Sequence, residues 1–355
     1  MKPFDTPPQD IVSLHDYRRY AAKILPANAW HYIDGASADE LTAQHNQHAF
    51  SRFHLKQRVL NGVTKVDTQV RLLTENHAFP LLLAPVAYQK LAHPSGEVGV
   101  MQAAAAQDIG YVLSTLSSTS LNEVIKYKAS NSAWFQLYIQ PQWSQTLQLI
   151  EQAEMAGYSA LVITVDAPIN GLRNREQRVG FCLPDGIAAV NIQGGNQPSS
   201  LEACLAVAPT WQTIEKIISA TKLPVILKGI SCVEDARLAK QLHLSGIVVS
   251  NHGGRVLDST APSINTLRAI REEVGQEMTV LLDSGIRRGT DVVKALALGA
   301  NAVMIGRPMM YALATAGPLG VAHMLRILKD EIQMTMALCG CENVGKISGD
   351  ILHDY

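Results

Sequence analysis

The chain has 355 residues, of which 47% are hydrophobic and only 17% charged, and its formal net charge is −1. Such a chain can bury a large core, but it is long for one domain unless that domain is a barrel. The near-zero charge and the lack of a basic stripe argue against a nucleic-acid partner. No apolar stretch reaches the roughly 20 residues that a membrane-spanning helix needs, so we expect a soluble protein without a transmembrane segment.

The amino terminus and the cysteines predict a cytoplasmic protein. Residues 1–10 carry three prolines and acids instead of a basic and then an apolar segment, which argues against a secretory signal. The five cysteines form no paired framework, and an odd number fits a reducing compartment. Cys339 and Cys341 end a long helical pattern without a second ligand pair, so we expect inert thiols and no metal site.

Along the chain, residues 1–75 are expected to form a helical extension packed on the main domain. Ser13 or Asp16 is the expected cap, and the apolar face is formed by Leu14, Tyr17, Ala21 and Leu25. In residues 76–355, short apolar runs alternate with helical patterns. The expected strands are 81–86, 111–114, 133–138, 160–165, 223–228, 246–250, 279–283 and 302–306. The expected helices include 96–108, 145–156, 233–242, 264–274 and 289–298.

Eight strand-helix repeats predict a closed (β/α)₈ TIM barrel, with a doubly wound open sheet as the alternative. We favour the barrel because polar groups follow nearly all eight strands, whereas an open sheet would concentrate them at one switch point. The connection after the fourth strand, residues 167–208, contains the polar run 193–200. A loop of this length is expected to be a mobile lid.

The sixth expected strand opens into the sequence SNHGGR at residues 250–255. The imidazole of His252 can accept a proton near neutral pH, and the guanidinium of Arg255 can grip a carboxylate with two parallel hydrogen bonds. A lone histidine or arginine is usually structural. Base, cation and two glycines together at a strand end are harder to explain by packing, and they predict a site for a small anionic hydroxy acid.

Other strand ends predict a phosphorylated ligand. The seventh strand runs into DSGIRRG at 283–289 and the eighth into GRP at 306–308, which brings glycine amides and arginines together where barrels commonly hold a phosphate. Tight turns alone would also explain the glycines. The fifth strand ends in Lys228, and burying its ammonium at the barrel mouth without an electron-rich partner would cost free energy. A reduced flavin ring would be such a partner.

Five motifs in order carry a resemblance that covers the chain from about residue 14 to 351. They are APVA at 84–87, FQLY at 135–138, TVD at 164–166, SNHGGR at 250–255 and DSGIRRG at 283–289. With them the chain resembles the FMN-dependent L-2-hydroxy acid oxidases and dehydrogenases, which include glycolate oxidase, lactate oxidase and membrane-bound lactate and mandelate dehydrogenases. The resemblance implies FMN as cofactor, oxidation of a small 2-hydroxy acid to the 2-oxo acid, and a homo-oligomer, by family a homotetramer.

The resemblance also implies residue roles. His252 would be the catalytic base, Asp166 its charged partner, and Tyr138 a hydrogen-bond donor to the hydroxyl. The implied substrate-binding residues are Tyr32, Tyr138, Arg173 and Arg255, with Leu116 shaping the pocket. The implied flavin-ring contacts are Pro85, Val86, Ala87, Ser114, Gln136, Thr164, Lys228 and Ser250. The implied ribityl and phosphate contacts are Asp283, Gly285, Arg287, Gly306 and Arg307. Lys228 would favour the reduced, anionic flavin.

Some residues depart from the family pattern or leave alternatives open. Leu116 stands where glycolate oxidase has tryptophan, and Tyr88 adds a bulky group near the same pocket, so substrate identity stays open. The residues after Gly171 depart from the family's usual spacing to an acidic residue, which weakens the assignment of Arg173 as a substrate-binding residue. Transfer of the α-hydrogen as hydride and its removal as a proton both require the same imidazole and carboxylate clamp.

Ala87 resembles the oxidases that use O₂ and form hydrogen peroxide, where several quinone-linked dehydrogenases have glycine. Residues 167–208 lack a long apolar insertion for membrane docking, and no haem domain precedes the barrel. We therefore expect O₂ as acceptor. A quinone-linked lactate or mandelate dehydrogenase, with peripheral membrane association, is the alternative.

Two other classes are weighed. A non-redox FMN-dependent isomerase or phosphate-sugar enzyme would not need the pair His252 and Arg255. A catalytically silent barrel predicts the loss of a site residue, yet Tyr32, Tyr138 and Lys228 are present as well.

Overall fold

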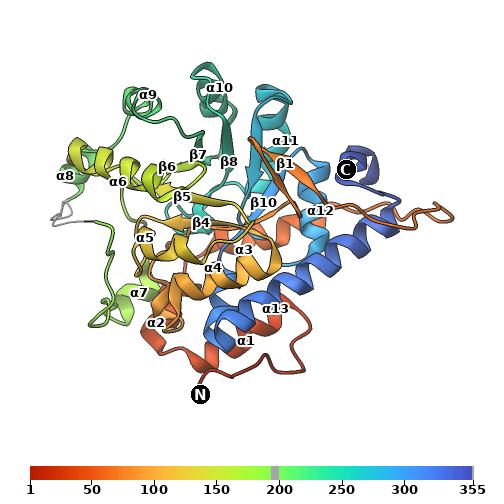
Figure 1. Ribbon diagram of the computed structural model, residues 1–355, viewed down its shortest axis with the longest axis horizontal. Coiled ribbons are helices and arrows are strands. Elements are labelled where there is room, and N and C mark those ends of the chain that lie inside the picture. Colours follow the sequence, from red (N-terminus) through yellow and green to blue (C-terminus); the bar gives the residue numbers. More distant parts are fainter. Residues whose placement is uncertain (193–199, 354–355) are drawn as a thin grey trace.

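Eight parallel strands close into a barrel in the computed structural model, which describes residues 1–192 and 200–353 (Figure 1). The strand order is β10-β3-β4-β5-β6-β7-β8-β9. The strands are β3 (Leu81–Leu83), β4 (Gly110–Ser114), β5 (Ala133–Leu137), β6 (Leu161–Thr164), β7 (Val225–Ile230), β8 (Gly246–Val249), β9 (Thr279–Leu282) and β10 (Ala302–Ile305). Each coincides with a predicted strand, so the predicted TIM barrel is confirmed and the open sheet is wrong.

The barrel strands are apolar on both faces because each face is buried, as is typical of parallel sheets covered by helices. Alternate residues such as Leu82, Val112 and Trp134 fill the barrel interior. Their neighbours Leu81 and Leu83 pack outward against the helices. The period of two along each strand thus supplies two cores, one inside the barrel and one between strands and helices.

The helices surround the barrel. They are α4 (Gly96–Gln107), α5 (Leu121–Val124), α6 (Trp143–Ala156), α9 (Trp211–Ala220), α10 (Val233–Gln241), α11 (Ser263–Val274), α12 (Gly289–Ala297) and α13 (Arg307–Cys339). The five with predicted ranges, α4, α6, α10, α11 and α12, agree with those ranges to within two residues, whereas α5, α9 and α13 had no predicted range. Short 3₁₀ turns are η1 (Ala49–Arg52), η2 (Gln89–Leu91), η3 (Ile125–Tyr127), η4 (His252–Gly254), η5 (Val344–Lys346) and η6 (Gly349–Ile351). Within the described residues, no helix is both long and apolar enough to cross a membrane.

The amino-terminal extension contains α1 (Leu14–Ile24), α2 (Ala27–Asp34) and α3 (Leu41–His48). The predicted apolar face of α1 is buried, and Figure 1 shows α1, in red, beside α13, in blue. Ser13 occupies the N-cap position without capping, because its hydroxyl donates to the Asp16 carboxylate instead.

An antiparallel hairpin of β1 (Val70–Leu72) and β2 (Glu75–His77) was missed by the sequence reasoning. It spans residue 75, the expected boundary between the helical extension and the barrel. Leu72 is fully buried and belongs to the core cluster of the barrel interior. Glu75 accepts hydrogen bonds from Ser132 and Ser159, which precede β5 and β6. The hairpin therefore closes the end of the barrel where the strands begin.

The connection at 167–208, expected to be one long loop, contains two short helices, α7 (Asn174–Arg178) and α8 (Leu201–Ala206). Most of the predicted polar run at 193–200, namely residues 193–199, lies outside the described residues.

Candidate active site

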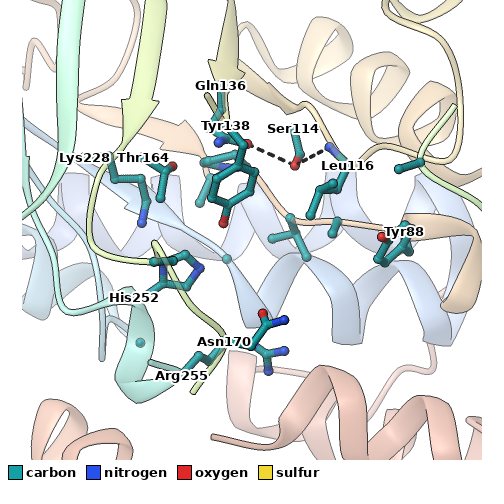
Figure 2. Close-up of a pocket in the computed structure, with 18 of the residues that line it drawn as sticks. Tyr88, Ser114, Leu116, Gln136, Tyr138, Thr164, Asn170, Lys228, His252 and Arg255 are labelled. Carbon is teal, nitrogen blue, oxygen red and sulfur yellow. Dashed lines mark hydrogen bonds between the residues drawn. The ribbon is translucent and has the colours of Figure 1, made fainter. Parts of the chain in front are cut away.

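The carboxyl ends of the barrel strands surround a cavity of about 1270 Å³, at the edge where barrels of this type carry their sites (Figure 2). All the predicted site residues except Asp166 and Ser250 line it. The lining residues among them are Tyr32, Pro85, Val86, Ala87, Ser114, Leu116, Gln136, Tyr138, Thr164, Arg173, Lys228, His252, Arg255, Asp283, Gly285, Arg287, Gly306 and Arg307. Asp166 and Ser250 lie directly behind lining side chains, which they hold by hydrogen bonds.

His252 and Asp166 form a hydrogen-bonded pair, with 2.9 Å between Nδ1 of the imidazole and Oδ1 of the carboxylate. Gly229 makes room for this pair, since a Cβ there would lie 2.5 Å from the Cβ of Asp166. Burial lowers the pKa of His252, against the opposing charge of Asp166. Because Asp166 accepts the proton on Nδ1, the other nitrogen, Nε2, carries the lone pair of a neutral base.

Arg255 is a buried cation beside Tyr32. Its Nη1 donates to the backbone oxygens of Tyr32 and Gly35 at 2.8 Å, and its guanidinium lies 5.2 Å from the centroid of the Tyr32 ring. Burial lowers the pKa of Arg255 to about 10, so it stays charged at neutral pH. These contacts use one end of the guanidinium and leave donors for a ligand carboxylate.

Lys228, which was expected to need an electron-rich partner, has two partners within the protein. Its Nζ lies 3.1 Å from Oδ2 of Asp283 and donates to Ser250 Oγ at 3.1 Å. Burial is the largest single influence and lowers the pKa of Lys228, but the charges of Asp283 and Asp166 and the hydrogen bond to Asp283 together raise the pKa overall. An ammonium has three donors, so one remains for a group in the cavity.

Tyr138 and Gln136 present unused polar atoms. Burial raises the pKa of Tyr138 to about 12, so its phenol stays protonated, and Figure 2 shows the hydroxyl pointing into the cavity toward His252. Gln136 accepts from Ser114 Oγ at 3.1 Å, while its buried Nε2 has no hydrogen-bond partner among residues 1–192 and 200–353. A buried donor without a partner is costly, and a ring carbonyl such as that of a flavin would satisfy it.

The far end of the cavity fits a phosphate. Arg287 is 9% exposed, and burial lowers its pKa, with the charge of Arg307 lowering it further. The buried Nε of Arg307 has no hydrogen-bond partner in the part of the chain that the structure describes, and Gly306 precedes the first turn of α13. Gly285 has φ +89°, and a Cβ there would collide with the backbone of Asn46. Two neighbouring cations at a helix amino terminus form an anion site, so these residues fit the phosphate of FMN.

Helix α7 brings Arg173 to the site together with a carboxylate that the sequence reasoning missed. One oxygen of Glu176 lies 3.5 Å from Nη1 of Arg173 and 3.4 Å from Nη2 of Arg255. Arg175 anchors the helix through a 2.9 Å ion pair with Asp34 of α2. The only sequence signal was the run Arg173 to Glu176 itself, because Arg255 and Asp34 lie far away along the chain.

An apolar wall closes the cavity on the side away from Lys228. Leu116 and Tyr88 lie there in Figure 2. Phe181 and Leu183, from the connection after β6, also line the cavity and were missed. The Phe181 ring stacks on Tyr32 with centroids 4.6 Å apart. The cavity therefore joins cations at one end to rings and aliphatic groups at the other.

Similarity to known proteins agrees with this geometry. Residues 21–354 match the FMN-dependent dehydrogenase family. The chain is 42% identical to 4-hydroxymandelate oxidase of Amycolatopsis orientalis, over 94% of this chain and 96% of the relative. It is 41% identical to L-lactate oxidase of Nostoc sp., over 96% of this chain and 98% of the relative. It is 37% identical to 2-hydroxyacid oxidase 2 of Rattus norvegicus, over 96% and 98%.

Solved structures of mandelate oxidase, with (S)-2-phenylpropionate and with benzoyl-formic acid, superimpose with a TM-score of 0.89. They are 42% identical to this chain, over 96% of it and 98% of theirs. With such a match along nearly its whole length, the chain belongs to the family of FMN-dependent 2-hydroxy acid oxidases and dehydrogenases, and its cofactor is FMN.

Proposed function

We propose that this enzyme oxidises a small L-2-hydroxy acid to the 2-oxo acid, with FMN as its cofactor and O₂ as its final acceptor. The observation that carries this proposal is the shared cavity of a neutral base, His252, and a buried guanidinium, Arg255. A base beside a carboxylate clamp is what oxidation of a 2-hydroxy acid requires.

In this mechanism, Arg255 and Arg173 bind the substrate carboxylate, with the phenol of Tyr32 beside them. Binding at two points fixes the carbon that carries the hydroxyl, and Tyr138 donates a hydrogen bond to that hydroxyl. Nε2 of His252 takes a proton from the substrate, and Asp166 stabilises the resulting imidazolium. Bound FMN supplies the acceptor for the two electrons that the alcohol loses.

The residues suited to hold FMN divide into two groups. Gln136 and Lys228 would donate to the ring carbonyls, while Arg287, Arg307 and the backbone at Gly285 would hold the phosphate. A fixed ammonium beside the ring stabilises negative charge that develops there. Pro85, Val86 and Ala87 would pack against the ring.

The choice of O₂ is supported by the relatives, which are named as lactate, 2-hydroxyacid and 4-hydroxymandelate oxidases. We further propose that the protein is a homotetramer and is cytoplasmic, since an odd number of cysteines, five, fits a reducing compartment. Exposed apolar side chains at Val59, Leu60 and Leu338 offer contact area between copies. Sedimentation analysis of the purified holoenzyme tests the tetramer.

The substrate and acceptor are tested together. The holoenzyme is mixed anaerobically with glycolate, L-lactate, L-mandelate and a long-chain 2-hydroxy acid, and bleaching of the flavin is followed before air is admitted. We expect bleaching by at least one acid, then rapid recovery of colour in air with release of hydrogen peroxide. Bleaching that air leaves unchanged but a quinone reverses would contradict the oxidase assignment.

His252→Asn tests the base. We expect the variant to retain FMN and its yellow colour, because His252 packs beside the cofactor site without holding the phosphate. The rate of flavin reduction should fall by about 10²- to 10⁴-fold, the usual contribution of a general base. Reduction at the wild-type rate would refute the role of His252.

A further inference from the structure

Tyr88 has a backbone conformation that bulky residues rarely adopt. Its φ and ψ are 53° and 50°, in the left-handed region, although it follows directly on the segment 85–87 that lines the cavity. For a large side chain this conformation is strained, and strain of this kind persists only where surrounding contacts enforce it.

The contacts that enforce it join two loops. The backbone N–H of Tyr88 donates to the carbonyl of Leu116 at 3.1 Å, and that of Gln89 donates to Oε1 of Glu97 at 3.0 Å. Glu97 is fully buried on the first turn of α4, and the same oxygen accepts from the backbone N–H of Ser118 at 2.8 Å. Oε2 of Glu97 accepts from Thr119 Oγ1 at 3.0 Å. One carboxylate thus ties the loop after β3 to the loop after β4.

The strained conformation directs the Tyr88 ring into the cavity. Its centroid lies 6.1 Å from that of Tyr32, which in turn stacks on Phe181. Figure 2 places Tyr88 beyond Leu116, on the side away from His252 and Lys228. A substrate whose carboxylate lies at Arg255 would therefore extend its side chain toward these rings.

We propose that Tyr88 selects the substrate side chain, so that the enzyme prefers 2-hydroxy acids carrying an aryl group to those carrying a methyl group, and that Glu97 is the positioning residue that holds Tyr88 in place. This inference rests on the proposed function. An aryl group gains ring contacts with Tyr88 and Tyr32. A methyl group leaves the space beside Leu116 and Tyr88 unfilled, and the contacts of its lining are lost.

The test compares kcat/KM for L-mandelate and L-lactate in the FMN-loaded enzyme, by anaerobic flavin reduction. The wild type should prefer mandelate. Tyr88→Ala should lower the ratio of kcat/KM for mandelate to kcat/KM for lactate at least 10-fold, mainly by raising KM for mandelate. The kcat/KM for lactate should change less than twofold. Tyr88→Phe keeps the ring and should keep the ratio. Tyr127→Ala removes an exposed tyrosine outside the cavity and serves as the matched control.

Glu97→Ala should shift the ratio in the same direction as Tyr88→Ala, and Glu97→Gln should restore most of it, because the amide oxygen can still accept from both backbone donors. The double variant of Tyr88→Ala and Glu97→Ala should have the ratio of Tyr88→Ala alone, since Glu97 acts through the ring. If the role of Glu97 were purely structural, Glu97→Ala would instead lower kcat/KM for both substrates equally. If Glu97→Ala does not fold, Tyr88→Ala and Tyr88→Phe still decide the role of Tyr88.

The two proposals fail differently. Reduction of the flavin by neither acid would overturn the proposed function. Reduction by both acids, with a ratio that Tyr88→Ala leaves unchanged, would overturn the role of Tyr88 and leave the oxidation of 2-hydroxy acids standing.

Discussion

At the scale of single residues, the site depends on a histidine in an uncommon backbone conformation. His252 has φ +56° and is followed by Gly253 and Gly254, which also have positive φ. This left-handed stretch turns the chain at the end of β8, and the hydroxyl of Ser284 accepts from the Gly253 N–H at 3.0 Å. The strain is concentrated at the residue that we propose as the catalytic base, and such strain is common in active sites.

The pKa of His252 predicts how activity depends on pH. Because burial lowers that pKa below 6.5, the imidazole is neutral and competent at neutral pH. We expect kcat/KM to be flat near pH 7 and to fall as the pH drops below 6.5 and the base becomes protonated. Steady-state rates between pH 4.5 and 8 measure this limb.

Asp166→Asn removes the negative charge that raises the pKa of His252. The acid limb should therefore move to lower pH, while the plateau falls by about 100-fold or more because the imidazolium loses its partner. An acid limb that moved to higher pH would contradict the pairing of these two side chains.

At the scale of elements, α7 places a carboxylate where a substrate carboxylate is expected to bind. Glu176→Gln removes this competitor for Arg173 and Arg255 while keeping its shape. We expect KM for the 2-hydroxy acid to fall by about threefold or more, with kcat nearly unchanged. Steady-state kinetics measure both constants, and Glu202→Gln, an exposed residue of α8, is the control. A rise in KM would mean that Glu176 holds the arginines in place instead.

Helix α2 ends at Asp34, a buried carboxylate with partners on three other helices. It accepts from Arg18 of α1 at 2.7 Å, from Arg175 of α7 at 2.9 Å and from the Tyr311 hydroxyl of α13 at 2.8 Å. Burial would raise the pKa of Asp34, but these hydrogen bonds and charges lower it to about 2. Its ionised form therefore stabilises the fold above pH 3.8, and this stabilisation is lost as the pH falls toward 2.

Asp34→Asn should lower the free energy of unfolding at pH 7 by about 3 kcal/mol, the usual cost of breaking a buried ion pair. It should also flatten the loss of stability between pH 4 and pH 2. Denaturant unfolding at a series of pH values measures both effects. Asp330→Asn breaks an exposed pair with Arg326 and should cost less than about 1 kcal/mol. Equal losses in the two variants would contradict the role of Asp34.

The elements predicted from sequence were those with a strong local pattern. Each barrel strand is an apolar run, and helices such as α11 and α12 have a repeating apolar face, so both could be identified from neighbouring residues. The hairpin of β1 and β2 was missed because two three-residue strands are too short to show a period. Glu176 and Glu97 were missed for another reason: the folded barrel brings Arg255 to Glu176 and Ser118 to Glu97, and neither contact can be read from neighbouring residues.

At the scale of the whole molecule, two cations converge at one end of the cavity. Arg287 and Arg307 repel each other until an anion lies between them, so FMN should stabilise the fold and raise the Tm of the apoprotein. Riboflavin, which lacks the phosphate, should raise it less. Arg287→Met should weaken FMN binding by about 10- to 100-fold and remove most of the difference between the two flavins.

Thermal unfolding of the apoprotein with FMN, riboflavin or neither measures this effect. Arg288→Met is the matched control, because Arg288 points away to an ion pair with Glu331 at 2.6 Å. An equal gain in Tm from FMN and from riboflavin would place the phosphate elsewhere.

The hairpin of β1 and β2 also determines from which end of the barrel ligands reach the cavity. Among the described residues, Leu72 and the bonds of Glu75 to Ser132 and Ser159 seal the rear of the barrel. Substrate and product must then enter and leave the cavity at the other end of the barrel, where the strands finish. A side chain that narrows the opening there would slow substrate binding and product release together, so the product must leave before the next substrate can bind.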